Sequence, residues 1–226
     1  MISKAVDDLR EGKPVLVYDF DDREAETDIV YAAEKVDHDD IARLRNDAGG
    51  LICTAIHPEA AERLGLPFIA DVLEDNPLVE EAGDLGYDSR SSFSLWVNHK
   101  SNYTGITDKD RAKTARKLSE AVGSSVSESA SVSEESPSIE EEFRTPGHMA
   151  VLRADEDLLE GRQGQTEMSV KLVDEAGLTP AAVICEMLDD ETGEALSKED
   201  AKRYADENGL TFVEGRQLVE VADAES

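Results

Sequence analysis

Residues 14–28 have the sequence PVLVYDFDDREAETD, in which a short apolar run is followed by a dense group of acidic side chains. The segment from Pro14 to Tyr18 has the length and composition of a buried strand. From Ile29 to Val36 the apolar residues recur at helical spacing, and Thr27 is suited to cap such a helix. We therefore expect the acidic residues to lie on a loop that connects a strand to a helix.

The acidic loop is a candidate metal site. Between residues 19 and 28, six carboxylates surround the single arginine, Arg23. Carboxylates this close together repel one another unless a cation lies among them. A hard divalent ion such as Mg2+ takes oxygen ligands and suits this composition. The alternative is a run of solvated charge, because the whole chain is acidic.

Length and charge limit the classes of partner. The chain has 226 residues and a formal net charge of -29, and this length suits one large domain or two small ones. A surface of this charge repels nucleic acids and anionic membranes, so we expect neither as a partner. It also repels anionic substrates, and any phosphate site must therefore be locally basic.

The distribution of the acidic residues suggests adaptation to high ionic strength. The acidic residues are spread along the whole chain rather than confined to a tail. Repulsion on this scale destabilises a compact fold at low salt, whereas at about 1 M salt the Debye length is about 3 Å and the repulsion is screened. The composition therefore indicates a halophilic intracellular protein.

Cysteine usage and hydropathy favour a cytoplasmic location. Cys53 and Cys185 both lie in apolar runs and outside any metal-binding spacing, which is typical of buried, reduced thiols. No apolar leader precedes Asp7, and no apolar stretch reaches the roughly 20 residues that cross a membrane. We expect a soluble cytoplasmic protein.

The remaining elements are predicted from apolar periodicity, caps and turns. Strands are expected within 51–56, 93–97, 149–152 and 182–187. Helices are expected over 3–10, 39–46, 58–64, 108–122, 167–176 and 198–207, with caps at Ser3, Thr107, Thr166 and Ser197. Strands and helices mix without strict alternation, which indicates one α/β or α+β domain on a mixed sheet over residues 1–226.

Residues 123–140 interrupt this pattern. They are rich in Ser and Glu, with the run GSSVSESASVSEESPS at 123–138. Such a composition cannot bury enough apolar surface to become ordered. We expect a surface loop or a disordered insertion within the single domain.

Four further positions are candidates for chemistry, and each also has an ordinary explanation. The loop 161–166 leads into a helix N-terminus and carries Arg162, which suits a phosphate, but any helix start has this form. His148 follows a Pro-Gly turn that can aim an imidazole at a site, or it is simply exposed. Glu186 ends a buried apolar run. It is either a candidate base with a raised pKa or a residue at the end of a strand that faces water. Thr104 begins a hydroxyl-bearing turn beside the most basic predicted helix.

Seven motifs in series resemble the 3,4-dihydroxy-2-butanone 4-phosphate synthases of riboflavin biosynthesis, and most of all their stand-alone archaeal form. The resemblance covers nearly the whole chain except the Ser/Glu stretch. The motifs are PVLVYDFDDREAETD, GGLICTAIHP, SSFSLWVNH, TGITDKDR, FRTPGHMAVLRA, GRQGQTEMSVKL and AAVICEM.

The resemblance implies a lyase that converts D-ribulose 5-phosphate to L-3,4-dihydroxy-2-butanone 4-phosphate and formate. It implies a requirement for Mg2+, with Mn2+ able to serve. It also implies a homodimer with residues of both subunits near each site, and the single-domain α/β fold of this family rather than a Rossmann sheet.

Within the acidic loop, the resemblance assigns Glu24 to the metal and Arg23 and Asp28 to the substrate. It places Glu26 in the same shell as a catalytic candidate. Cys53 matches a cysteine that lines the site and is a further catalytic candidate.

Elsewhere the resemblance places Thr104 near the substrate phosphate. It assigns His148 and Glu186 to proton transfers, and Glu186 also to substrate binding. The remaining substrate positions form one loop, in which the first and last residues suit the phosphate. The loop consists of Arg162, Gln163, Gly164, Gln165 and Thr166.

Gln165 departs from the family pattern, which has a histidine here as the second protein ligand of the metal. An amide oxygen can bind a hard cation, but it cannot titrate as imidazole does. Three interpretations stay open: Gln165 binds the metal through its oxygen, water replaces the ligand, or the protein is impaired. The alternative function is a non-catalytic acidic metal-binding or interaction protein that has kept the fold.

Overall fold

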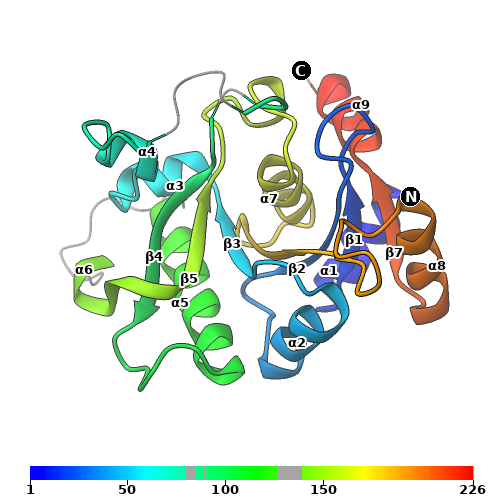
Figure 1. The fold of residues 1–226 in the computed structure, drawn as a ribbon. Coiled ribbons are helices and arrows are strands. Elements are labelled where there is room, and N and C mark those ends of the chain that lie inside the picture. The colour runs from blue at the N-terminus through cyan, green and yellow to red at the C-terminus, as the bar shows by residue number, and fades with distance from the viewer. Residues whose placement is uncertain (80–84, 89, 127–138, 226) are drawn as a thin grey trace.

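The computed structural model describes residues 1–79, 85–88, 90–126 and 139–225. Within these residues the chain forms a seven-stranded sheet in the order β4-β5-β3-β6-β2-β1-β7, which runs from left to right in Figure 1. β1 is parallel to β7 and β3 to β5, and the other neighbours are antiparallel, so the expected mixed sheet is confirmed. The strands are β1 (Val15–Tyr18), β2 (Thr27–Ala32), β3 (Cys53–Ile56), β4 (Phe93–His99), β5 (Phe143–Arg153), β6 (Ala181–Glu186) and β7 (Thr211–Glu214).

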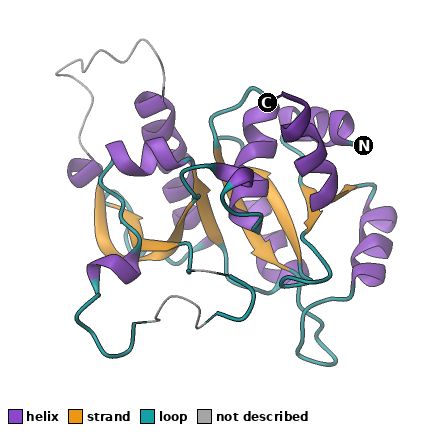
Figure 2. Ribbon diagram, turned by 90° about the horizontal axis from the view of Figure 1, so that it is seen from above, coloured by secondary structure: helices purple, strands orange, loops and turns teal. Residues whose placement is uncertain are grey.

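Helices cover both faces of the sheet (Figure 2). One apolar cluster lies between the sheet and α2, α3, α5 and α8, and a second lies between the sheet and α1, α7 and α9. Both chain ends lie at the β7 end of the sheet. The helices are α1 (Ile2–Arg10), α2 (His38–Arg43), α3 (Pro58–Arg63), α4 (Ile69–Val72), α5 (Asp108–Val126), α6 (Ile139–Glu142), α7 (Gln165–Glu175), α8 (Lys198–Asn208) and α9 (Gly215–Glu225).

The helix expected over 29–36 is wrong. Residues Thr27–Ala32 form strand β2, which pairs antiparallel with β1 and β6. Every residue of β2 is buried, with Ile29 in one apolar cluster and Val30 in the other. A strand covered on both faces has apolar residues at consecutive positions, so it lacks the alternation that identifies a strand in sequence. The acidic residues therefore lie on a hairpin loop between two strands, and Asp28 lies within the second strand.

Two of the five predicted helix caps are confirmed, and Thr27 is not a cap because it begins strand β2. The hydroxyls of Thr107 and Ser197 each accept the backbone N–H three residues later, at 3.2 Å. Ser3 and Thr166 are not caps, because Ser3 lies inside α1 and α7 begins one residue before Thr166. The residue that precedes α7 is Gly164, whose extended backbone ends the loop.

The Ser/Glu stretch is described only at its ends. Residues 123–126 belong to α5 and residues 139–140 to α6. The rest of the expected loop, 127–138, lies outside the described residues, and its disorder stays a prediction. Cys53 and Cys185 are free and buried, as predicted. In the part of the chain that the structure describes, no helix is both long and apolar enough to cross a membrane.

Candidate active site

A cavity of about 350 Å³ lies where the acidic hairpin, β3, the end of β6 and the start of α7 meet. It brings together residues that are far apart in sequence and that the family resemblance had assigned to one site. Seven of the predicted residues line it: Glu24, Asp28, Cys53, Arg162, Gln165, Thr166 and Glu186.

Sheet pairing sets two of the cavity carboxylates side by side. Asp28 on β2 and Glu186 at the end of β6 are partners in the antiparallel ladder. Paired residues project from the same face of a sheet. Asp28 is 1% exposed, and neither carboxylate oxygen has a hydrogen-bond partner among the described residues. Glu186 Oε2 accepts the backbone N–H of Leu51 at 2.8 Å.

Burial and mutual repulsion perturb these carboxyl groups. Burial raises the pKa of Asp28 well above its usual range, and the charges of Glu186 and Glu26 add to the effect. Burial, followed by the charges of Glu24 and Glu186, raises the pKa of Glu26 to about 7. Burial also raises the pKa of Glu186. A cation among these groups would favour their ionised forms, so the cavity is electrostatically suited to one.

Gln165 adds a further oxygen to the cavity. Its Nε2 donates to the backbone oxygens of Val17 and Glu26, each at 3.1 Å. Its Oε1 is buried and has no hydrogen-bond partner among the described residues. An orphan amide oxygen that shares a cavity with the carboxylates of Glu24 and Asp28 suits a hard divalent cation, which takes oxygen ligands of both kinds.

The Asp19 carboxylate stabilises the conformation of the acidic hairpin through two hydrogen bonds from its backbone. Its Oδ1 accepts the N–H of Glu26 at 2.9 Å, and its Oδ2 accepts the N–H of Glu24 at 3.1 Å. Asp21 points elsewhere and accepts the hydroxyl of Tyr18 at 2.7 Å. The acidic residues therefore divide into those that shape the hairpin and those that face the cavity.

Sequence reasoning missed Asp88, which joins the two arginines assigned to the substrate. Its Oδ2 accepts from Nη2 of Arg23 and from Nε of Arg162, each at 2.5 Å. Asp88 lies in a stretch for which no helix or strand was predicted, and 65 residues separate it from Arg23. No local pattern could have identified it, because its role exists only once the two arginines have been brought together.

Glu167 was also missed and fixes the other side of Arg162. Its carboxylate is fully buried and accepts from Nη1 of Arg162 at 2.7 Å and from the N–H of Gly164 at 3.2 Å. A Cβ at position 164 would meet the guanidinium and this carboxylate at less than 3.0 Å, so a side chain there would displace the ends of both groups. Gln163, in contrast, is exposed and does not line the cavity.

His148 and Thr104 are not brought to the cavity. They lie together at the edge strand β4, where Asn98 connects them. Asn98 Nδ2 lies 3.0 Å from His148 Nδ1 and donates to the backbone oxygen of Thr104 at 3.3 Å. Exposed apolar side chains lie nearby in sequence, with Trp96 39% and Tyr103 95% exposed. These two predicted residues therefore form a second cluster, separate from the first.

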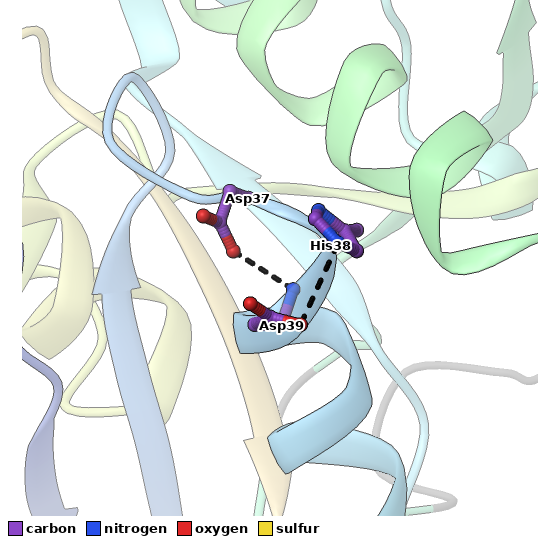
Figure 3. Close-up of side chains that lie close together, drawn as sticks. All are labelled: Asp37, His38 and Asp39. Carbon is purple, nitrogen blue, oxygen red and sulfur yellow. Dashed lines mark hydrogen bonds and ion pairs between the residues drawn. The ribbon is translucent and has the colours of Figure 1, made fainter.

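A third cluster consists of Asp37, His38 and Asp39 (Figure 3). It is exposed and is explained by helix capping. The Asp37 carboxylate accepts the N–H of Asp39 at 2.8 Å and that of Asp40 at 3.3 Å, which caps α2. His38 Nε2 lies 3.5 Å from Asp39 Oδ1. The group needs no metal to account for its geometry.

The sequence matches proteins of known name along nearly its whole length. A family model described as 3,4-dihydroxy-2-butanone 4-phosphate synthase matches residues 3–221. A protein of that name from Archaeoglobus fulgidus is 54% identical over 219 residues, which cover 94% of this chain and 90% of that protein. Another of that name, from Methanosarcina mazei, is 50% identical over 227 residues, with 97% and 90% covered.

Solved structures give the same result. The structure of a 3,4-dihydroxy-2-butanone 4-phosphate synthase in complex with two magnesium ions superposes with a TM-score of 0.80 at 26% identity and covers 99% of this chain and 96% of that one. The Candida albicans enzyme superposes with a TM-score of 0.76 at 29% identity and covers 98% and 96%. Sequence and fold agree, and the chain belongs to the 3,4-dihydroxy-2-butanone 4-phosphate synthase family.

Proposed function

We propose that the protein converts D-ribulose 5-phosphate to L-3,4-dihydroxy-2-butanone 4-phosphate and formate, a lyase reaction of riboflavin biosynthesis. The observation that carries this proposal is the cavity in which Glu24, Asp28 and Glu186 face Arg162 and Gln165. A non-catalytic protein would have no reason to keep the Asp28 carboxylate buried without a hydrogen-bond partner among the described residues, because such a group lowers stability. The impaired or non-catalytic alternative is therefore not favoured.

Arg162 and Thr166 bind the substrate phosphate in this proposal. Thr166 lies in the first turn of α7 and Arg162 in the loop that leads into it, where backbone N–H groups and the helix dipole favour an anion. Arg23 and Asp28 contact the sugar hydroxyls. Cys53, which is 1% exposed, is part of the wall of the cavity on β3.

Glu24 and Gln165 would hold the divalent cation, Mg2+ or in its place Mn2+. When bound, the cation would stabilise negative charge that develops on neighbouring oxygens of the substrate. The oxygen donors of the two side chains suit both ions. Glu26, whose backbone oxygen holds Gln165, supports this group from the hairpin.

The reaction requires several proton transfers. A base removes the C3 proton to give an enediol, and an acid assists loss of the C1 hydroxyl. A shift of the carbon skeleton follows, and hydration then releases C4 as formate. We assign these transfers to Glu186, which lines the cavity, and to His148.

Because His148 and Thr104 lie outside the cavity, we propose that they act in the site of a second copy. The exposed Trp96 and Tyr103 beside them offer apolar surface for such a contact. A homodimer would carry two sites, each with the cavity of one subunit and His148 of the other. We propose in addition that the protein is cytoplasmic and halophilic, and that it acts as this homodimer.

Release of formate from D-ribulose 5-phosphate with Mg2+ in molar KCl tests the activity. We expect turnover by the wild-type protein and its loss in Glu186→Gln. A folded wild-type protein that releases no formate under these conditions would contradict the proposed function and favour the non-catalytic alternative.

A further inference from the structure

The orientation of the Gln165 amide is fixed by its two partners. Both Val17 O and Glu26 O are backbone carbonyl oxygens, which accept hydrogen bonds and cannot donate them. The NH2 group must therefore face these two atoms, and the oxygen must face the opposite way. Exchanging O and N would place the amide oxygen of Gln165 against the two carbonyl oxygens, with no hydrogen to share between them. The amide therefore has one acceptable orientation.

The oxygen that results is buried and has no donor among the described residues. Gln165 is 7% exposed and lines the cavity, and its Oε1 has no hydrogen-bond partner among the described residues. A buried acceptor left unpaired lowers the stability of the folded protein. The guanidinium in the cavity does not relieve it, because Arg162 donates to Asp88 and Glu167.

The other groups around this oxygen are also acceptors. Asp28 is 1% exposed with both carboxylate oxygens unpaired, and Glu24 and Glu186 line the same cavity. No histidine is among the described residues of the lining. A hard cation takes amide and carboxylate oxygens as ligands, so it would satisfy this acceptor where no hydrogen-bond donor does.

We infer that Gln165 Oε1 is a ligand atom of the divalent cation, and that the cation site is made of protein oxygens alone and prefers hard ions to nitrogen-seeking ones. This inference rests on the proposed function, because it concerns the same cavity. The family resemblance implies an imidazole ligand at this position, and in this protein the amide of Gln165 takes its place. Imidazole suits Ni2+ and Zn2+, whereas carboxylate and amide oxygens suit Mg2+ and Mn2+.

Cation binding to the full-length protein without substrate tests the inference. Calorimetric titration with Mg2+ and with Ni2+ would compare the wild type with Gln165→His and Gln165→Leu. We expect Gln165→His to raise Ni2+ affinity by about tenfold or more relative to its effect on Mg2+. We expect Gln165→Leu to lower Mg2+ affinity by about tenfold or more. Equal Mg2+ affinity in wild type and a folded Gln165→Leu would overturn the inference.

A spectroscopic readout does not depend on the stability of a leucine variant. With Mn2+ bound, electron spin echo modulation from a coordinated imidazole nitrogen is expected in Gln165→His and absent in the wild type. An imidazole nitrogen signal of equal strength in the wild type would contradict an all-oxygen site. These measurements use no substrate, so a wild type that binds Mg2+ as expected but releases no formate would contradict only the proposed function.

Discussion

Arg23 and Arg162 share one acceptor, since Nη2 of the first and Nε of the second each lie 2.5 Å from the same carboxylate oxygen of Asp88. The Asp88 side chain is 6% exposed, so the three charges are largely shielded from water. Carboxylates of the hairpin and α7 also contact these arginines. The positive charge available to a substrate phosphate is therefore set by the acids around it.

Asp88→Asn should strengthen phosphate binding. Two unit charges about 4 Å apart interact by roughly 4 kcal/mol near a protein surface before screening by salt, so removing one acid makes the pair of arginines markedly more attractive to an anion. We expect the inhibition constant of inorganic phosphate against D-ribulose 5-phosphate to fall several-fold. Asp22→Asn, an exposed position on the hairpin, removes the same charge and serves as the control. A higher inhibition constant in Asp88→Asn would mean that Asp88 assists anion binding.

Glu167→Gln should destabilise the fold and weaken substrate binding. The fully buried carboxylate accepts from Arg162, from the N–H of Gly164 and from the N–H of Asp155, at 2.7, 3.2 and 2.9 Å. An amide would set its NH2 group against at least one of these donors and would remove one of the two buried ion pairs of Arg162, at a cost of about 3–5 kcal/mol. Denaturant unfolding and the KM for D-ribulose 5-phosphate would measure the two effects.

The control for Glu167→Gln lies on the same helix. Glu175 forms an ion pair with Lys171 one turn earlier and is partly exposed, so Glu175→Gln should cost less than about 1 kcal/mol and leave KM unchanged. If the two variants lost equal stability, the buried carboxylate would not be the anchor of Arg162.

Subunit mixing tests the shared site. His148→Ala and Glu186→Gln should each be inactive alone. If His148 acts in the cavity of its partner, an equal mixture should recover about a quarter of the wild-type formate release, because half of the dimers are mixed and each has one intact site. Recovery requires exchange of subunits, which light scattering after dilution and reassociation would verify. A mixture as inactive as its components would place His148 outside any shared site.

Thermal stability should rise with salt. The net charge of -29 makes repulsion among exposed carboxylates a large destabilising term at low ionic strength. Since the Debye length is already about 3 Å at 1 M, most of the increase in Tm should occur between about 0.1 and 1 M KCl. Sucrose at matched osmolality is the control for effects other than screening. A Tm that is flat or falls over this range would exclude a halophilic adaptation.

His99 should make stability depend on pH. Burial lowers the pKa of His99, opposed by the charge of Glu142 and assisted by that of Lys113. The unfolded chain takes up this proton near pH 6.5, whereas the folded chain does so only at lower pH, so the unfolding free energy falls as pH drops through this window. The stability gap between wild type and His99→Asn should therefore shrink from pH 7.5 to pH 5. His38→Asn, an exposed position, is the control. A gap that is constant with pH would contradict the assignment.

Strands β1, β3 and β6 were predictable because each is a short apolar run that ends in turns or loops. β2 was not, since burial on both faces removes the alternation that marks a strand. The same limit applied to the site. Glu24 and Arg162 each lie in a motif of the family resemblance, which predicted that they share a site, and both line the cavity. Asp88 and Asn98 could not be assigned from sequence, because each joins groups that only the folded sheet and its loops bring together.

The pairing of Asp28 with Glu186 also limits how this site can change. Their separation is set by the backbone ladder of β2 and β6 and not by the length of any loop. Inserting or deleting one residue within either strand would turn one of the two carboxylates to the opposite face of the sheet. Grafting this site into another protein would therefore require both strands as an intact neighbouring pair. The segments that supply the arginines could be redesigned around that pair.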